Sequence, residues 1–278
     1  MKKILTSPDK FTCPIYSAYI IISSSFYGWN IVAFIINYSN LDEYAIINRL
    51  STWMTWQHWV LFILFLISIA VFLVRHNILK VLRINYKFFF YHWYIQVLIV
   101  LIGSLNIGLY QTENYVHLFR LIEFSLCIWA SVLLASQFYH SDILILRHPT
   151  TIGSSIISTL ILGISVIILS NIFEDVVNSA IFWYLTLIIF DMFIFVARFR
   201  YLSAASNQTK LFAQRLMGSL ILFTGIRLII GIFMPLVYSV YMIISAQNFG
   251  HGIALMMMIG QIIDRPLFLC YNTANSLS

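Results

Sequence analysis

The sequence has little charge, since only 9% of its 278 residues are Asp, Glu, Lys or Arg. A soluble domain carries about 25% charged residues because its surface must be polar. A chain with so few charges cannot cover itself with polar groups, which excludes a soluble globular protein. Disorder is excluded as well, because 61% of the residues are hydrophobic and disordered chains are poor in such side chains. The composition therefore predicts an integral membrane protein that is surrounded by the lipid bilayer.

Cysteine is also scarce. Cys13, Cys127 and Cys270 are far apart, and no C-x-x-C spacing occurs. This pattern excludes a disulfide framework, a zinc ribbon and an iron–sulfur site, so we expect the chain to bind no metal of its own. The net charge of +6 is small for a nucleic-acid-binding protein, and we expect no nucleic acid partner. The first 13 residues lack a cleavable signal sequence, so the first apolar run is expected to be retained.

Long, continuously apolar runs dominate the rest of the chain. A membrane-spanning helix needs about 20 mostly apolar residues. Eight segments meet this requirement: 15–36, 56–74, 88–110, 118–139, 152–172, 177–196, 211–232 and 236–262. The expected fold class is therefore all-α, a polytopic transmembrane helix bundle with eight spans in one domain over residues 1–278. The last two spans are separated only by Met234 and Pro235, where we expect a tight turn; if these two spans were fused, seven would remain.

The basic residues predict the orientation of the bundle. If the spans alternate in direction, all of the 16 Lys and Arg residues except Arg49, Arg120 and the intramembrane Arg227 lie on the side of the N-terminus. Lys and Arg concentrate in cytoplasmic loops. We therefore expect an even number of spans in the cell inner membrane, with both termini in the cytoplasm.

Two charged residues lie well inside predicted spans, Asp191 in the sixth and Arg227 in the seventh. With a rise of about 1.5 Å per residue, their depths differ by roughly three helical turns. A direct ion pair would require the helices to be shifted, so each side chain is expected to be satisfied separately by other polar groups. Glu123 follows Arg120 by one turn and is expected to form a pair with it near the membrane face.

His251 lies near the middle of the last predicted span, between Gly250 and Gly252. Imidazole is a haem ligand, and small neighbours would let a macrocycle approach. No second histidine is placed at a matching depth, so an interhelical hydrogen bond is the alternative that we favour.

A basic segment with interspersed polar side chains joins the second and third spans. It contains His76, Lys80 and Arg83, and it leads to His92 and Gln96 in the third span. A quinone needs a flat apolar slot, donors to its two oxygens and a route for protons, and this segment could supply the polar groups. The bias of positive charge towards the cytoplasm explains the basic residues equally well.

Three stretches together resemble the membrane-anchor subunit of dimethyl sulfoxide reductase-type molybdoenzymes, an eight-helix quinol-oxidising family. The stretches are Ser136-Gln137-Phe138-Tyr139, then Arg147-His148-Pro149-Thr150-Thr151 with Ile156-Ile157-Ser158-Thr159-Leu160, and Gly260-Gln261-Ile262-Ile263-Asp264-Arg265-Pro266-Leu267-Phe268. The seventh span, with Arg215, Arg227 and Pro235, is similar to the family as well. The sequence departs from the family's quinol-site pattern, because Lys80 replaces an Arg and both Gln96 and Gln261 replace a Glu. An amide retains hydrogen bonding but cannot accept a proton.

The resemblance implies an anchor that holds a molybdopterin catalytic subunit and an iron–sulfur subunit, and that passes electrons from menaquinol to the latter. It places His76, Lys80, Arg83, His92 and Gln96 around the quinol, with Asp191, Arg227, Gln261 and Arg265 as supporting polar residues; the chain itself would hold no catalytic centre, haem or metal. The alternatives are a small transporter that uses Asp191 and Arg227, a haem-b electron carrier built on His251, and a degenerate anchor that docks its partners without oxidising quinol.

Overall fold

The structure is a computed structural model that describes the backbone of residues 7–39, 43–108, 113–141, 146–170, 177–204, 206–245 and 251–273. All regular structure in these segments is helical, which confirms the predicted all-α class. The elements are α1 (Ser7–Ser39), α2 (Glu43–Leu73), α3 (Arg75–Leu82), α4 (Tyr86–Gly108), α5 (Glu113–Tyr139), α6 (Pro149–Ser170), α7 (Val177–Ala204), α8 (Asn207–Met217), α9 (Ile221–Leu228), the π-helical turn η2 (Ile229–Phe233), α10 (Met234–Ser245) and α11 (His251–Thr273).

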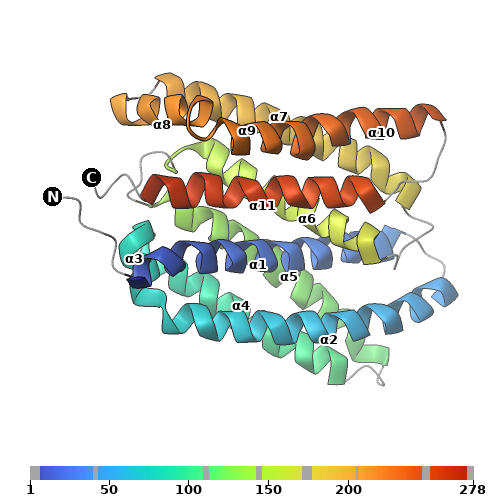
Figure 1. Cartoon of the computed structure of the whole chain (residues 1–278). Helices are drawn as coiled ribbons and strands as arrows, with labels where there is room; N and C mark the ends of the chain where they lie inside the picture. Colours follow the sequence, from blue (N-terminus) through green and yellow to red (C-terminus); the bar gives the residue numbers. More distant parts are fainter. Residues whose placement is uncertain are drawn as a thin grey trace.

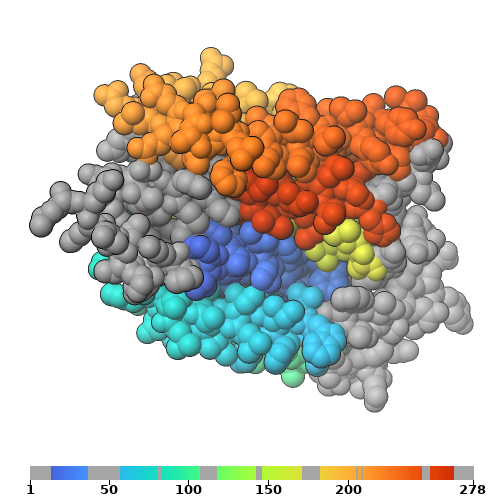
Figure 2. All heavy atoms as spheres, viewed as in Figure 1, coloured from blue at the N-terminus to red at the C-terminus, as the bar shows by residue number. Residues whose placement is uncertain are grey.

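The long helices run roughly along a common direction and form one bundle (Figure 1). The pair α1 and α6 occupies the middle and makes the most extensive helix–helix contact. On one flank α2, α4 and α5 pack together, and on the other α7, α9, α10 and α11 do so. In the space-filling view α1 reaches the surface as a strip between α11 and the α2–α4 pair (Figure 2). The central position of α1 explains why its interior face carries so many buried residues.

Six helical segments in the described part of the chain are long and apolar enough to cross a membrane: Pro14–Ile36, Tyr86–Asn106, Leu118–Tyr139, Pro149–Ser170, Phe182–Ala204 and Ile221–Ser245. A shorter apolar helix covers Gln57–Leu73. Large hydrophobic side chains are exposed along these helices, as expected where lipid replaces water. The chain is therefore a multi-pass membrane protein.

Two glycines set the distance between the central helices. A Cβ atom added to Gly28 in α1 would lie 1.8 Å from the backbone oxygen of Thr159 in α6, and one added to Gly163 would lie 2.1 Å from the carbonyl carbon of Gly28. Because lipid tails are as apolar as the helix surfaces, helices in membranes associate through close packing at small residues. The α1–α6 contact depends on the absence of side chains at these two positions.

The predicted turn at Met234 and Pro235 is wrong. The helix continues through both residues, so one candidate span runs from Ile221 to Ser245, and α11 begins only at His251. Proline lacks an N–H group, and its ring clashes with the carbonyl of the residue four positions earlier. The π-helical turn η2 directly precedes Pro235, and the Met234 N–H bonds to the Ile229 carbonyl five residues back. This wider turn lets the proline remain inside a spanning helix.

The two short helices α3 and α8 lie at the same end of the bundle, beside the start of α1 and the end of α11 (Figure 1). Both have basic residues on their exposed sides, Lys80 on α3 and Lys210 and Arg215 on α8. Residues 207–217 were predicted in part as the start of a span, but they form α8 instead. Its apolar face, with Phe212 and Leu216, packs into a separate hydrophobic cluster.

Candidate functional site

The five residues predicted to surround a quinol do not come together. His76 and Lys80 are exposed on α3, and Arg83 is exposed directly after it, where its left-handed backbone (φ 47°) ends the helix. His92 and Gln96 instead lie inside the bundle and are almost completely buried. The basic segment and the polar pair of α4 are therefore two separate features.

His92 and Gln96 belong to a buried histidine cluster, which we define as Tyr19, Ser23, Tyr27, Ser68, His92 and Gln96. The Tyr19 hydroxyl lies 3.1 Å from His92 Nδ1, and the Tyr27 hydroxyl lies 3.1 Å from Nε2. Both hydroxyls also donate to Gln96 Oε1, at 2.8 and 2.7 Å. Gln96 Nε2 in turn donates to Ser68 Oγ at 2.5 Å. The cluster thus joins α1, α2 and α4.

The histidine cluster is closely packed and has the character of a structural network. The Tyr19 and Tyr27 hydroxyls each have one hydrogen, which they donate to Gln96 Oε1, so a neutral His92 donates its single N–H to one of these two hydroxyls. All of these side chains are buried, and tilted or edge-on ring contacts hold His92 between the two tyrosines. Buried polar networks with satisfied members fix a unique packing. We therefore assign this cluster to holding α1 against α4.

Sequence reasoning missed the tyrosines of α1. Tyr16, Tyr19 and Tyr27 point into the bundle, and Tyr16 donates a 2.5 Å hydrogen bond to Gln137 of α5. The signal was their spacing of three and eleven residues, which places them on one face of a helix. The spacing alone does not reveal which polar groups on other helices they meet.

A second group of buried polar side chains, the ion-pair cluster, consists of Ser158, Asp191, Arg227, Gln261, Asp264 and Arg265. Arg227 pairs with Asp191 through Nη2 and with Asp264 through Nε, the latter at 3.1 Å. Gln261 Nε2 donates to Asp191 Oδ2 at 3.1 Å, and Ser158 donates to Gln261 Oε1. Arg227 is 1% exposed and Asp191 is 3% exposed, so this is a fully buried pair.

The expectation that Asp191 and Arg227 are satisfied separately is therefore wrong. Because residues 207–217 form α8, the spanning helix begins at Ile221 and not at Leu211. Arg227 consequently lies 6 residues after the start of its span, and Asp191 lies 13 residues before the end of Phe182–Ala204, so their depths differ by about two helical turns and the long arginine side chain bridges them. The four predicted supporting residues, Asp191, Arg227, Gln261 and Arg265, do come together.

The ion-pair cluster also contains groups that sequence reasoning did not assign. Asp264, the second partner of Arg227, could have been noted because it lies three residues after Gln261 on α11. Gly231 of η2 and Gly260 of α11 meet at this level, since a Cβ added to Gly260 would lie 2.4 Å from Gly231 Cα. A narrow crevice next to Arg227 is lined by Ser154, Asp191, Ile194, Phe195, Arg198 and Asp264.

A third group, the carboxylate cluster, consists of the buried polar side chains of Gln57, Arg120 and Glu123, together with Gly103, which lies against Glu123. Glu123 is 2% exposed, and its Oε1 accepts a 2.6 Å hydrogen bond from Gln57 Nε2. Arg120 is also buried, so both side chains point into the bundle, in the first two turns of the span Leu118–Tyr139. Buried carboxylates need such donors because desolvation is costly.

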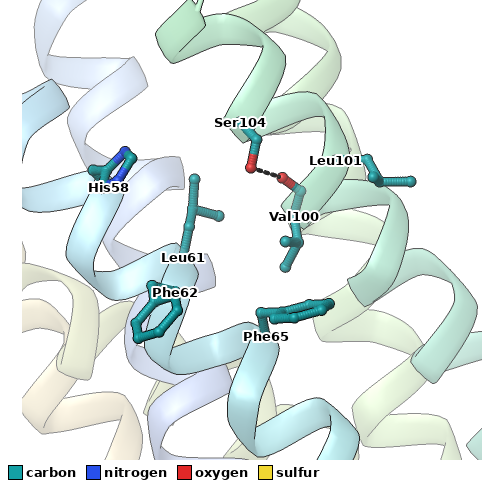
Figure 3. Close-up of a pocket in the computed structure, with 7 residues that line it drawn as sticks. All are labelled: His58, Leu61, Phe62, Phe65, Val100, Leu101 and Ser104. Atoms are coloured by element: carbon teal, nitrogen blue, oxygen red, sulfur yellow. Dashed lines mark hydrogen bonds between the residues drawn. The ribbon is translucent and has the colours of Figure 1, made fainter.

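An open pocket of about 280 Å³ lies between α2 and α4, next to the carboxylate cluster (Figure 3). Its walls are His58, Leu61, Phe62, Phe65, Val100, Leu101 and Ser104. Sequence reasoning did not assign a site here, because both helices read simply as spans.

No group of three or more His, Cys, Asp and Glu side chains in the described part of the chain could hold a metal ion. His251, considered as a haem ligand, begins α11 and is exposed, so the prediction that it lies near the middle of a span is wrong.

No protein-family model matches the chain, and neither does any curated protein or solved structure.

Proposed function

We propose that the chain is an eight-span inner-membrane anchor that oxidises menaquinol and passes the electrons to an iron–sulfur subunit of a molybdopterin enzyme of the dimethyl sulfoxide reductase type. The observation that carries this proposal is the convergence of residues from the stretches with the resemblance. Ser158, Arg227, Gly260 and Gln261 come from three distant parts of the sequence, and they meet in the ion-pair cluster. Chance similarity of short motifs would not by itself bring the matching residues together.

The eight spans follow if the Gln57–Leu73 helix and α11 are added to the six long apolar helices. The ion-pair cluster explains why α11 has charged residues in a membrane, since Asp264 and Gln261 face partners inside the bundle. With eight spans both termini lie at the end that carries α3 and α8, and the basic residues of these helices favour the cytoplasmic side.

Quinol oxidation releases two electrons and two protons, so an anchor of this kind must supply proton acceptors and a contact surface for its redox partner. The experiment is to isolate the chain with its bound partners from native membranes and to measure menaquinol-dependent reduction of the iron–sulfur subunit. We expect an iron–sulfur subunit and a molybdopterin subunit to co-purify with the chain, and their clusters to be reduced by menaquinol. A complex that forms but is not reduced would mean a degenerate anchor, and the absence of both partners would contradict the proposal.

A small transporter is the second candidate, because one observation favours it. Arg227 lies two residues before Ile229, the first residue of the π-helical turn η2, and transporters place binding sites at interrupted helices near the middle of the membrane. In proteoliposomes containing only this chain, an imposed pH gradient should then dissipate faster with the native chain than with an Arg227→Met variant. Equal rates would argue against transport of protons or of ions coupled to them.

A further inference from the structure

The pocket between α2 and α4 is lined mostly by apolar and aromatic side chains. Its walls include the aromatic rings of Phe62 and Phe65, which are exposed on the outside of the bundle and therefore face lipid (Figure 3). The pocket has His58 on α2 and Ser104 on α4 as polar groups. Ligand sites are typically apolar, with a few polar groups that fix orientation. A molecule dissolved in the bilayer can enter this pocket without crossing water.

A buried carboxylate lies directly behind the pocket. Leu61 lines the pocket, and a Cβ atom added to Gly103 would lie 2.7 Å from Leu61 Cδ1 and 3.3 Å from Glu123 Oε1. Leu61, a buried core residue, thus lies between the pocket and the carboxylate, and the lack of a side chain at Gly103 leaves room for its methyl group. Gln57, one helical turn before Leu61 on α2, donates a hydrogen bond to Glu123 Oε1.

We propose that this pocket binds the head group of a quinol and that Glu123 accepts a proton from it. The inference rests on the proposed function and gives that function a site. Glutamine occupies positions 96 and 261, and an amide cannot accept a proton, whereas a carboxylate can. Glu123 supplies such a group, and His58 supplies a second one within the same pocket.

The chemistry balances with these two acceptors. The quinol loses both hydroxyl protons, one to the Glu123 carboxylate and one to the neutral imidazole of His58. Its two electrons leave one at a time to the iron–sulfur clusters of the partner subunit, and the quinone returns to the lipid through the open side of the pocket. Both protons then pass to water at the nearby membrane face, because Gln57 and His58 lie at the end of the apolar segment of α2.

Binding is tested on the purified chain in nanodiscs with menaquinone-4 as the probe. Ser104→Trp fills the proposed pocket and should weaken binding at least tenfold. Gly225→Trp is a matched control, because it fills another lipid-facing hollow, lined by Ile221, Leu222, Ile226, Ile229 and Ile230. Unchanged binding in Ser104→Trp, or an equal loss in both variants, would overturn the pocket assignment. If the native chain itself bound no menaquinone, the proposed function would fail instead.

The proton acceptor is tested in the complete complex. Glu123→Gln has the same shape and still accepts the Gln57 hydrogen bond, so menaquinone-4 binding should persist. Menaquinol-dependent turnover should fall at least a hundredfold, as for loss of a general base, and Glu123→Asp should restore part of it. Turnover that persists in Glu123→Gln would exclude Glu123 as the acceptor, and a loss of binding would show that Glu123 has only a structural role.

Discussion

Arg227 lies between two buried carboxylates, so the removal of one of them should lower the stability of the fold. Asp191→Asn would leave Arg227 with one carboxylate partner in a buried site, and breaking a buried ion pair costs about 3–5 kcal/mol. We expect a large fall in the midpoint of thermal unfolding of the detergent-solubilised chain. The double variant Asp191→Asn, Arg227→Met removes both charges of one pair and leaves Asp264 opposite Arg265, so it should recover most of the loss. A double variant as unstable as the single one would contradict this account of the ion-pair cluster.

His148, just before α6 and outside the spanning segments, predicts a dependence of stability on pH. Its ring stacks on Tyr201 at 4.0 Å, and burial together with the nearby Arg198 charge lowers the pKa of His148 below its ordinary value of 6.5. The unfolded chain therefore binds a proton at a higher pH than the folded chain does. The contribution of His148 to the free energy of unfolding is therefore fully present above pH about 6.5, and it is lost as the pH falls below that value.

The measurement is the unfolding midpoint of the native chain and of His148→Phe between pH 7.5 and about 5. Phenylalanine keeps the stacking on Tyr201 but does not titrate, so the variant should lose less stability on acidification. Parallel curves for the two proteins would mean that His148 does not contribute.

At the scale of single residues, the sequence predicted which polar side chains are important better than it predicted their partners. Asp191 and Arg227 were identified because charges are unusual in apolar spans, and Gln261 and Arg265 were identified through the resemblance; the structure brings the four together. Asp264 and the tyrosines of α1 were missed because their roles depend on which helices are neighbours. That information is absent from the local pattern of one helix.

At the scale of helices, the α1–α6 contact gives a steric prediction. Gly28→Ala places a methyl group 1.8 Å from the Thr159 carbonyl oxygen, which is backbone and cannot rotate away. The helices must separate, and overpacking of this kind costs about 1–3 kcal/mol. Gly225→Ala is the control, because nothing lies within 4 Å of the added methyl and alanine favours a helix by about 1 kcal/mol. Thermal unfolding should show opposite shifts for the two variants.

The helix boundaries show which sequence signals are reliable in a membrane protein. The first six predicted spans each overlap one long helix. A continuous apolar run of that length can satisfy its own backbone hydrogen bonds in lipid only as a helix. The last two were divided at Pro235, since proline normally ends a helix in a soluble protein. Here the π-helical turn accommodates it, and neighbouring helices make such irregularities tolerable in membranes.

At the scale of the whole molecule, many of the basic side chains fall into two groups, one at an end of the bundle and one buried inside it. Basic side chains on α3 and α8 lie at one end of the bundle, while Arg120, Arg198, Arg227 and Arg265 are buried within it. The first group was predictable from the alternation of spans and loops. In the second group the sequence predicted only the position of Arg227 inside a span, because the cost of burying a charge depends on partners from helices that are distant in the sequence.

The distribution of basic residues leads to a prediction of topology. His76 on α3 and His251 at the start of α11 are both exposed, and they lie at opposite ends of the bundle. With eight spans and cytoplasmic termini, a cysteine at position 76 faces the cytoplasm and one at position 251 faces the opposite side. We expect a membrane-impermeant maleimide to label His251→Cys in intact spheroplasts and His76→Cys only in inside-out vesicles. Cys13 and Cys270 would first be changed to Ser, whereas Cys127 is buried and can remain. Labelling of both positions from the same side would require an even number of spans between them, instead of the five between α3 and α11, and would remove the support for an anchor with both termini in the cytoplasm.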